Sequence, residues 1–125
     1  MKNVGIAILL LQVLTACSIV NIFTGHEHIA GVTIMSVEDI QNDSGDMTRE
    51  IRGVISDSFE SNDEWILAIR TIHEQKKLAG SKMLILVFLE DEPWEDGVAY
   101  ARGRFENNKL ISLKVDGIQL VMNKP

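Results

Sequence analysis

The sequence is poor in the residues and motifs that identify many enzymes and metal proteins. It has one cysteine in 125 residues, which excludes an intramolecular disulfide and a cysteine-rich zinc site. It contains no Gly-x-Ser-x-Gly elbow, no phosphate-binding loop and no Gly-x-Gly-x-x-Gly fingerprint. Positive charge is also scarce, with 12 Lys and Arg against 18 Asp and Glu. Nucleic acid is therefore not expected as a partner, because that affinity comes mainly from cations on phosphates.

The length and composition are those of an ordinary folded domain. A chain of 125 residues is long enough for one domain with one core. Hydrophobic residues make up 46% and charged residues 24%, values typical of folded rather than disordered proteins. No motif indicates a cofactor, so none is expected.

The first residues have the order of a secretory signal peptide. Lys2 supplies a positive start, an apolar run follows from Val4 to Leu14, and small residues come next. The ending Leu14-Thr15-Ala16-Cys17 resembles the lipobox of bacterial lipoproteins and contains the only cysteine of the chain. This resemblance implies cleavage between Ala16 and Cys17, a diacylglycerol on the Cys17 thiol, and an acyl chain such as palmitate on the new amine.

The leader indicates a body held in the bacterial cell envelope, with the membrane as partner through the lipid at the cysteine. Such chains anchor well because each buried methylene contributes roughly 0.8 kcal/mol. In lipoproteins of this type, aspartate after the cysteine retains the protein in the inner membrane, and here Ser18 follows instead. The periplasmic face of the outer membrane is therefore favoured in a Gram-negative cell. The alternative is an uncleaved anchor helix over Val4 to Phe23, which has 20 mostly apolar residues.

These features divide the chain into three parts. Residues 1–16 are the signal peptide, residues 17–27 are the lipidated cysteine and tether, and residues 28–125 are a single domain. The tether is apolar from Ile19 to Phe23, whereas a free linker is usually polar. It is therefore expected to lie at the bilayer interface or against the domain.

Hydrophobic patterning predicts several strands in the body. Alternating residues indicate strands with one buried face, and a continuous apolar run indicates a strand buried on both faces. The predicted strands are an extended segment at His28–Ile40, then Met47–Ser56, Met83–Leu89 (apolar throughout), Gly97–Glu106, Leu110–Val115 and a short edge strand at Ile118–Met122. The intervening Asn107-Asn108 pair tolerates the positive φ of a tight hairpin turn.

One helix is predicted between the second and third of these strands. Ser61 and Glu64 form a capping box, in which each side chain satisfies the other residue's exposed amide. Apolar residues then recur at helical spacing, namely Trp65, Ile66, Ile69 and Ile72. Gly80 is suited to the position just past the helix end. The helix is predicted over Asn62–Ala79.

Together the elements predict an α+β fold, a small mixed β-sheet of about four to six strands in the order β-β-α-β-β-β with one main helix on one face. This leaves one face of the Met83–Leu89 strand without a helix. The tether and the His28–Ile40 segment are expected to fold over that face. The alternative is that a partner protein or a second copy of the chain covers it, because large apolar patches rarely stay exposed on monomers.

The order of these elements, from Met35 to Asp116, resembles a small domain of unknown function found in bacterial and phage lipoproteins. The resemblance includes the Leu84–Phe88 strand ending in acidic residues and the stretch Gly97-Val98-Ala99-Tyr100-Ala101-Arg102-Gly103. It implies no activity and no functional residues.

Two groups of residues are candidate ligands for metal ions. His26 and His28 would lie on the same side of a strand and could share a metal, but the sequence specifies no third ligand. They are weak candidates, and a solvated tether is the preferred interpretation. The segment Glu90–Asp96 is rich in carboxylates, but its spacing does not match an EF-hand loop. It is interpreted as a solvated loop.

Three further residues are candidates for binding. Trp94, in the acidic loop, is expected either to pin the loop to the core or to anchor a partner. Arg102 and Arg104 lie two apart on one strand and therefore share a face. Their planar guanidinium groups could bind a carboxylate or phosphate, or they could pair with neighbouring acids.

The sequence thus favours a membrane-anchored, non-catalytic binding or protein-interaction module, with an envelope protein or a second copy as the partner. Whether it is an enzyme is left open, with non-enzyme favoured because no catalytic set is visible. The alternatives are a small envelope hydrolase that uses Asp, Glu and His, and a structural accessory of a larger assembly.

Overall fold

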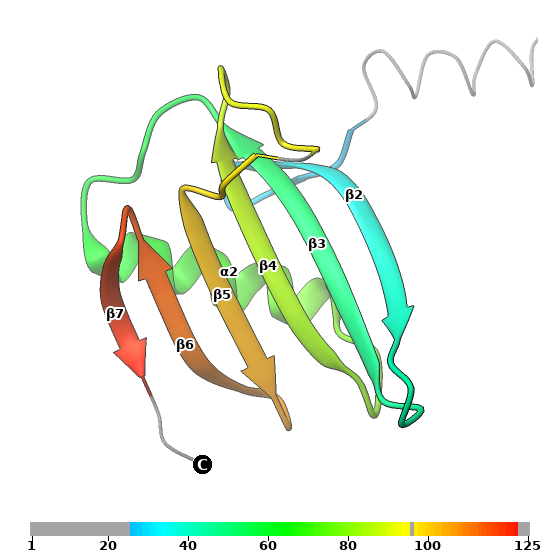
Figure 1. Ribbon diagram of the computed structural model, residues 1–125. Coiled ribbons are helices and arrows are strands. Elements are labelled where there is room, and N and C mark those ends of the chain that lie inside the picture. The colour runs from blue at the N-terminus through cyan, green and yellow to red at the C-terminus, as the bar shows by residue number, and fades with distance from the viewer. Residues whose placement is uncertain (1–25, 96, 123–125) are drawn as a thin grey trace, which may run out of the picture.

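The computed structural model describes residues 26–95 and 97–122, which form one β-sheet with one helix packed against it (Figure 1). The seven strands lie side by side in the order of the chain. The elements are β1 (His28–Ile29), β2 (Val32–Gln41), β3 (Met47–Ile55), α2 (Asn62–Lys76), β4 (Lys82–Leu89), β5 (Ala101–Glu106), β6 (Lys109–Val115) and β7 (Ile118–Met122).

The sheet is mixed, because β3 and β4 are parallel and every other pair of neighbours is antiparallel. Parallel neighbours need a crossover connection. Here α2 provides it, passing behind the sheet in the view of Figure 1. The predicted α+β class, with a mixed sheet and one helix on one face, is confirmed.

The predicted strand number and order were wrong, since the sheet has seven strands and the order is β-β-β-α-β-β-β-β. The difference arises at the N-terminal extended segment. Ala30 and Gly31 adopt positive φ values of 51° and 85° and form a tight turn. The segment therefore folds back on itself, with His28 opposite Thr33. Glycine is the residue best suited to such a backbone conformation, and alanine is rare there.

The helix begins as predicted and ends earlier. The Ser61 hydroxyl accepts a hydrogen bond from the Glu64 amide at 3.2 Å, so the predicted cap is present. The predicted end at Ala79 was wrong, because the last helical residue is Lys76. Lys77 turns to an extended conformation while its amide still donates to the His73 carbonyl at 2.8 Å.

The C-terminal strands follow two tight turns. Asn107 and Asn108 have φ values of 52° and 62°, as expected of a hairpin in which both turn residues are left-handed. The strand before this turn starts at Ala101 and not at the predicted Gly97. The Gly97 amide donates instead to the Pro93 carbonyl at 2.8 Å, within the loop that joins β4 to β5.

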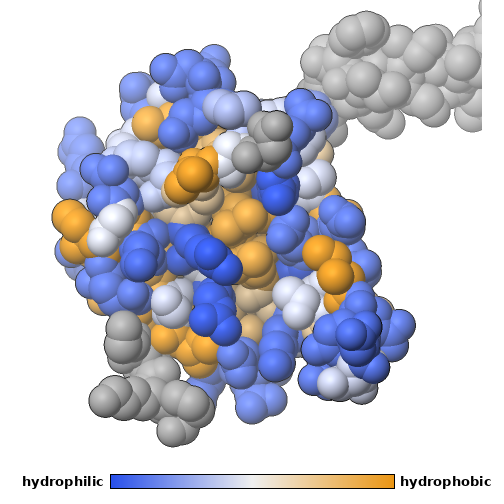
Figure 2. All heavy atoms as spheres, viewed as in Figure 1, coloured by the Kyte–Doolittle hydropathy of each residue, from blue (hydrophilic) through white to orange (hydrophobic). Residues whose placement is uncertain are grey.

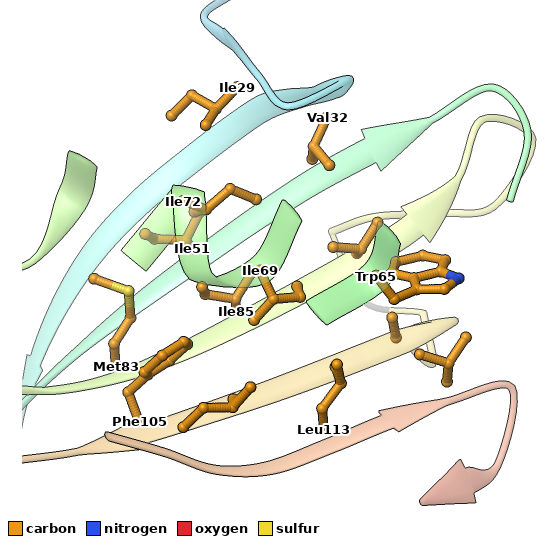
Figure 3. Close-up of a cluster of buried hydrophobic side chains, with 14 of the residues drawn as sticks. Ile29, Val32, Ile51, Trp65, Ile69, Ile72, Met83, Ile85, Phe105 and Leu113 are labelled. Atoms are coloured by element: carbon orange, nitrogen blue, oxygen red, sulfur yellow. The ribbon is translucent and has the colours of Figure 1, made fainter. Parts of the chain in front are cut away.

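The core lies between α2 and the sheet (Figure 3). Trp65, Ile69 and Ile72 of the helix pack on buried residues from the strands, among them Ile29, Val32, Ile51, Met83, Ile85, Phe105 and Leu113. The helix and β5 approach closely at Gly103, where an added Cβ would lie 2.8 Å from the Cγ2 of Ile69. The N-terminal strands thus extend the same helix-covered core.

Candidate functional site

The face of the sheet that points away from α2 is the candidate functional surface. The side chains of β4 alternate between the two faces. Met83, Ile85 and Val87 are buried on the helix side. On the other side Phe88 is fully buried, whereas Leu84 and Leu86 are only half-buried. The prediction that this strand is buried on both faces was therefore right for only part of its length.

The buried part of this face is covered by the loop between β4 and β5. The Arg52 guanidinium carbon lies 5.9 Å from the centre of the Phe88 ring. The same guanidinium donates to the carbonyls of Trp94 and Glu95, each at 2.7 Å, and to the Glu50 carboxylate at 3.1 Å. The tether and the His28–Ile40 segment were expected to fold over this face. For the segment this was wrong, because it adds strands to the sheet edge. Residues 17–25 of the tether lie outside the described residues.

The remainder of this face is a groove of about 600 Å³ beside the half-buried leucines. Figure 2, which views this face, shows apolar atoms at its centre with strongly hydrophilic side chains close by. The groove is lined by Leu86, Gly97, Val98, Ala99, Tyr100, Arg102, Arg104, Ser112, Lys114, Gly117 and Gln119. Its volume lies within the roughly 300–1,000 Å³ typical of small-molecule sites.

The groove brings together cations from two strands. Arg102 and Arg104 alternate with buried residues on β5 and both line the groove, as does Lys114 of β6. Arg104 lies 3.5 Å from the Glu106 carboxylate, with more than half of the arginine side chain exposed. The side chains of Arg102 and Lys114 make no hydrogen bond or ion pair with any other residue in the ranges 26–95 and 97–122.

Sequence reasoning missed the contribution of β6 and β7 to this groove. Lys114 lies directly opposite Arg102, and Ser112 lies opposite Arg104. Gln119 of β7 lies opposite Lys114, and its side-chain amide donates to the Ser112 hydroxyl at 3.0 Å. The only available signal was the alternation in Leu110–Val115, which did not fix the register.

Trp94 is half-buried in the loop that covers Phe88. Its backbone carbonyl accepts a hydrogen bond from the Arg52 guanidinium, and this contact fixes this part of the loop. In the same loop, the Glu92 carboxylate accepts a hydrogen bond from the Leu89 amide at 2.7 Å. The loop is therefore tied to the sheet by hydrogen bonds at two places.

The candidate histidines do not converge on a metal site. The Nδ1 atom of His28 lies 3.0 Å from the Thr33 hydroxyl across the first hairpin. Among the described residues, no group of three or more His, Cys, Asp or Glu side chains is placed to hold a metal ion. The weak candidates His26 and His28 thus have no third ligand within that part of the chain.

A second cavity, of about 490 Å³, lies between α2 and the β5–β6 turn and includes the third histidine. His73 is buried and stacks on Phe105, with ring centres 4.0 Å apart and planes 6° apart. Burial lowers the pKa of the His73 imidazole, and the carboxylate of Glu74 opposes that effect. Glu74 is itself bonded to Lys77 at 2.8 Å, and the Thr71 hydroxyl donates to a helix carbonyl. These polar groups are therefore engaged in local contacts.

The predicted lipidation and cleavage positions, Ala16 and Cys17, lie outside the described residues. Within the described ranges, no helix is both long and apolar enough to cross a membrane. No protein-family model, curated protein or solved structure matches the chain. The resemblance to a small lipoprotein domain therefore stays a prediction.

Proposed function

We propose that this chain is a membrane-anchored, non-catalytic binding module of the bacterial envelope, and that the open face of its sheet is the binding surface. The observation that carries the proposal is the groove beside Leu86, which combines exposed cations with half-buried leucines. Folding does not require this combination, because the helix-side core is complete without it.

The arrangement of the polar side chains favours binding over catalysis. A hydrolase of the alternative kind needs a nucleophile or activated water beside a free base. Of the described histidines, His73 stacks on Phe105 behind the sheet, and His28 lies on the edge strand beside Thr33. None of the three described histidines, His26 included, is among the residues that line the groove of the open face.

The anchor in this proposal is the lipid at Cys17. It rests on the lipobox-like ending of the apolar leader. Replacing Cys17 by alanine should abolish incorporation of labelled palmitate and leave unprocessed precursor. Normal processing at Ala16 in the Cys17→Ala variant would contradict the anchor, without bearing on the binding surface.

The binding surface is tested by labelling with a membrane-impermeant maleimide after gentle opening of the outer membrane. The Ser112→Cys variant places a thiol in the groove, and the matched Leu67→Cys variant places one on the outer side of α2, where the leucine is 67% exposed. If the groove is occupied in the envelope, the thiol at position 112 reacts more slowly in the envelope than in the purified protein. The thiol at position 67 should react alike in both. Equal labelling of both thiols in both preparations would contradict the proposal.

A further inference from the structure

Two cross-strand rows of side chains lie at the groove, and all of their members except Leu84 line it. Antiparallel pairing places Leu86, Arg102, Lys114 and Gln119 in one row across β4 to β7. The neighbouring row contains Leu84, Arg104 and Ser112. Directly opposite side chains are within interaction distance, with Cβ atoms about 4.5–5.5 Å apart. Each row therefore presents a leucine, one or two cations and a neutral hydrogen-bonding group.

The charges in these rows lower the stability of the folded sheet. Arg102 and Lys114 stand directly opposite each other, and like charges in that position destabilise a sheet. The chain has 18 acidic residues against 12 basic ones, yet Glu106 is the one described carboxylate that contacts this cluster, and it does so through Arg104. An anion placed between the two opposed cations would relieve their repulsion and accept their hydrogen bonds.

The apolar part of the surface lies beside these cations. Leu86 is half-buried at the floor of the groove, next to Arg102 in the row. A second aliphatic side chain in the lining, that of Val98, is 89% exposed. A bound anion would therefore lie next to hydrocarbon surface.

The size and surroundings of the groove favour a small soluble ligand over a bilayer. A volume of about 600 Å³ suits one small molecule. The loop beside the groove exposes Glu90, Asp91 and Glu95. These carboxylates would be repelled by the negative surface of an anionic membrane.

We infer that the groove binds a small water-soluble amphipathic anion, that is, a phosphate or carboxylate group carried on a hydrocarbon chain. The anionic group lies among Arg102, Arg104 and Lys114, and the hydrocarbon lies on Leu86. Charged hydrogen bonds to oxyanions of this type are the strong ones in proteins. The inference rests on the proposed function, because it names the ligand class of the same surface.

The test uses the full chain in phosphatidylcholine nanodiscs, titrated with hexyl phosphate in a calorimeter, with empty nanodiscs as the blank. Hexyl phosphate should bind more tightly than inorganic phosphate, and hexanol should give no saturable heat. Arg102→Gln should weaken hexyl phosphate about tenfold or more, the equivalent of one charged hydrogen bond. The matched Arg70→Gln variant, which removes the same charge from α2, should change the affinity less than about twofold.

The Leu86→Ser variant distinguishes the contribution of the alkyl chain to the affinity from that of the phosphate group. It should weaken hexyl phosphate several-fold and leave inorganic phosphate unchanged, because only the alkyl chain loses its contact. Absence of saturable binding by hexyl phosphate, or equal weakening by Arg102→Gln and Arg70→Gln, would overturn the inference. Loss of binding when phosphatidylglycerol replaces part of the phosphatidylcholine would identify lipid headgroups as the occupant and would also overturn it. Protection of the Ser112→Cys thiol in the envelope would stand in each of these cases, so the proposed function can survive a wrong ligand class.

Discussion

The two faces of the sheet come from the same strands but use their side chains differently. On the helix side, Ile51, Ile69 and Ile85 are completely buried. On the open side, Leu86 stays half-buried between exposed cations. Burial of a large aliphatic side chain contributes roughly 1.5–3 kcal/mol, so the helix face accounts for much of the stability. The open face retains a composition that stability alone does not explain.

The arginines of the sheet also differ in whether their side chains have partners within the fold. Arg49 of β3 donates to both carboxylate oxygens of Asp39, at 2.7 and 2.9 Å, and to the Lys76 carbonyl at the helix end. Those hydrogen bonds hold the pKa of Asp39 below its ordinary value. Arg52, also of β3, donates hydrogen bonds to the Glu50 carboxylate and to two loop carbonyls. Arg102 of β5 has no such partner among the described residues. The β3 arginines therefore stabilise the fold through these contacts, whereas the Arg102 side chain makes no comparable contribution among the described residues.

The largest expected effect lies on the helix face. Replacing Ile69 by alanine should lower the free energy of unfolding by roughly 2–5 kcal/mol, because it removes a buried side chain and leaves a cavity beside Gly103. Leu67→Ala is the matched control on the same helix, since that leucine is exposed, and it should stay within about 0.5 kcal/mol. A denaturant melt measures both. A neutral Ile69→Ala variant would show that α2 is misplaced.

A smaller loss is expected where the loop is tied to the open face. Arg52→Gln should cost roughly 1.5–3 kcal/mol, because the shorter side chain cannot keep the charged hydrogen bonds to the loop carbonyls. The same change should speed proteolysis within the loop that joins β4 to β5. A variant as stable and as resistant as the parent would mean that Arg52 does not hold the loop over Phe88.

The next largest loss of stability is expected at the helix cap. Ser61→Ala should cost about 0.5–2 kcal/mol, since it removes the acceptor of the Glu64 amide. Ser61→Asp keeps an acceptor at the same position and should recover most of that loss in the same melt. If both substitutions cost the same, the loss does not come from the missing hydrogen-bond acceptor.

The buried histidine predicts a dependence of stability on pH. Burial is the main cause that lowers the pKa of His73 in the folded protein. The Glu74 carboxylate raises this pKa, and the cations of Lys77 and Arg70 lower it further. The unfolded chain therefore binds the proton more readily. Stability should fall as the pH drops below about 6.5, with a slope from this group of at most about 1.4 kcal/mol per pH unit. Melts between pH 5 and pH 7 should show a shallower slope for His73→Gln. An unchanged slope would assign the dependence to other groups.

Local signals predicted most of the elements of this fold. The Ser61–Glu64 pair marked the start of the helix, and Asn107-Asn108 marked a hairpin turn. These features depend on neighbours in the sequence, so their physics is visible in a short stretch. The first hairpin was missed because alanine at position 30 is an uncommon residue for a left-handed turn.

The candidate site was predictable only in part, because it depends on register. Arg102 and Arg104 were singled out from their spacing, but their neighbours on β6 were not. The register shifts between Arg104 and Phe105, and this places Lys114 opposite Arg102. Without the shift, counting back from the turn would put Leu113 there. A single β-bulge thus decides whether the opposing side chain is apolar or charged, and nothing local in the sequence marks it.

The most direct test of the account is the stability of the Lys114→Gln variant. In the proposed function the groove cations serve binding, and the opposed pair of Arg102 and Lys114 is a cost to folding. Removing the Lys114 charge should therefore leave the free energy of unfolding unchanged or raise it by roughly 0.2–1 kcal/mol in low salt, with the gain shrinking as salt is added. A loss of stability as large as that of Arg52→Gln would contradict it, because Lys114 would then be a residue that the fold requires.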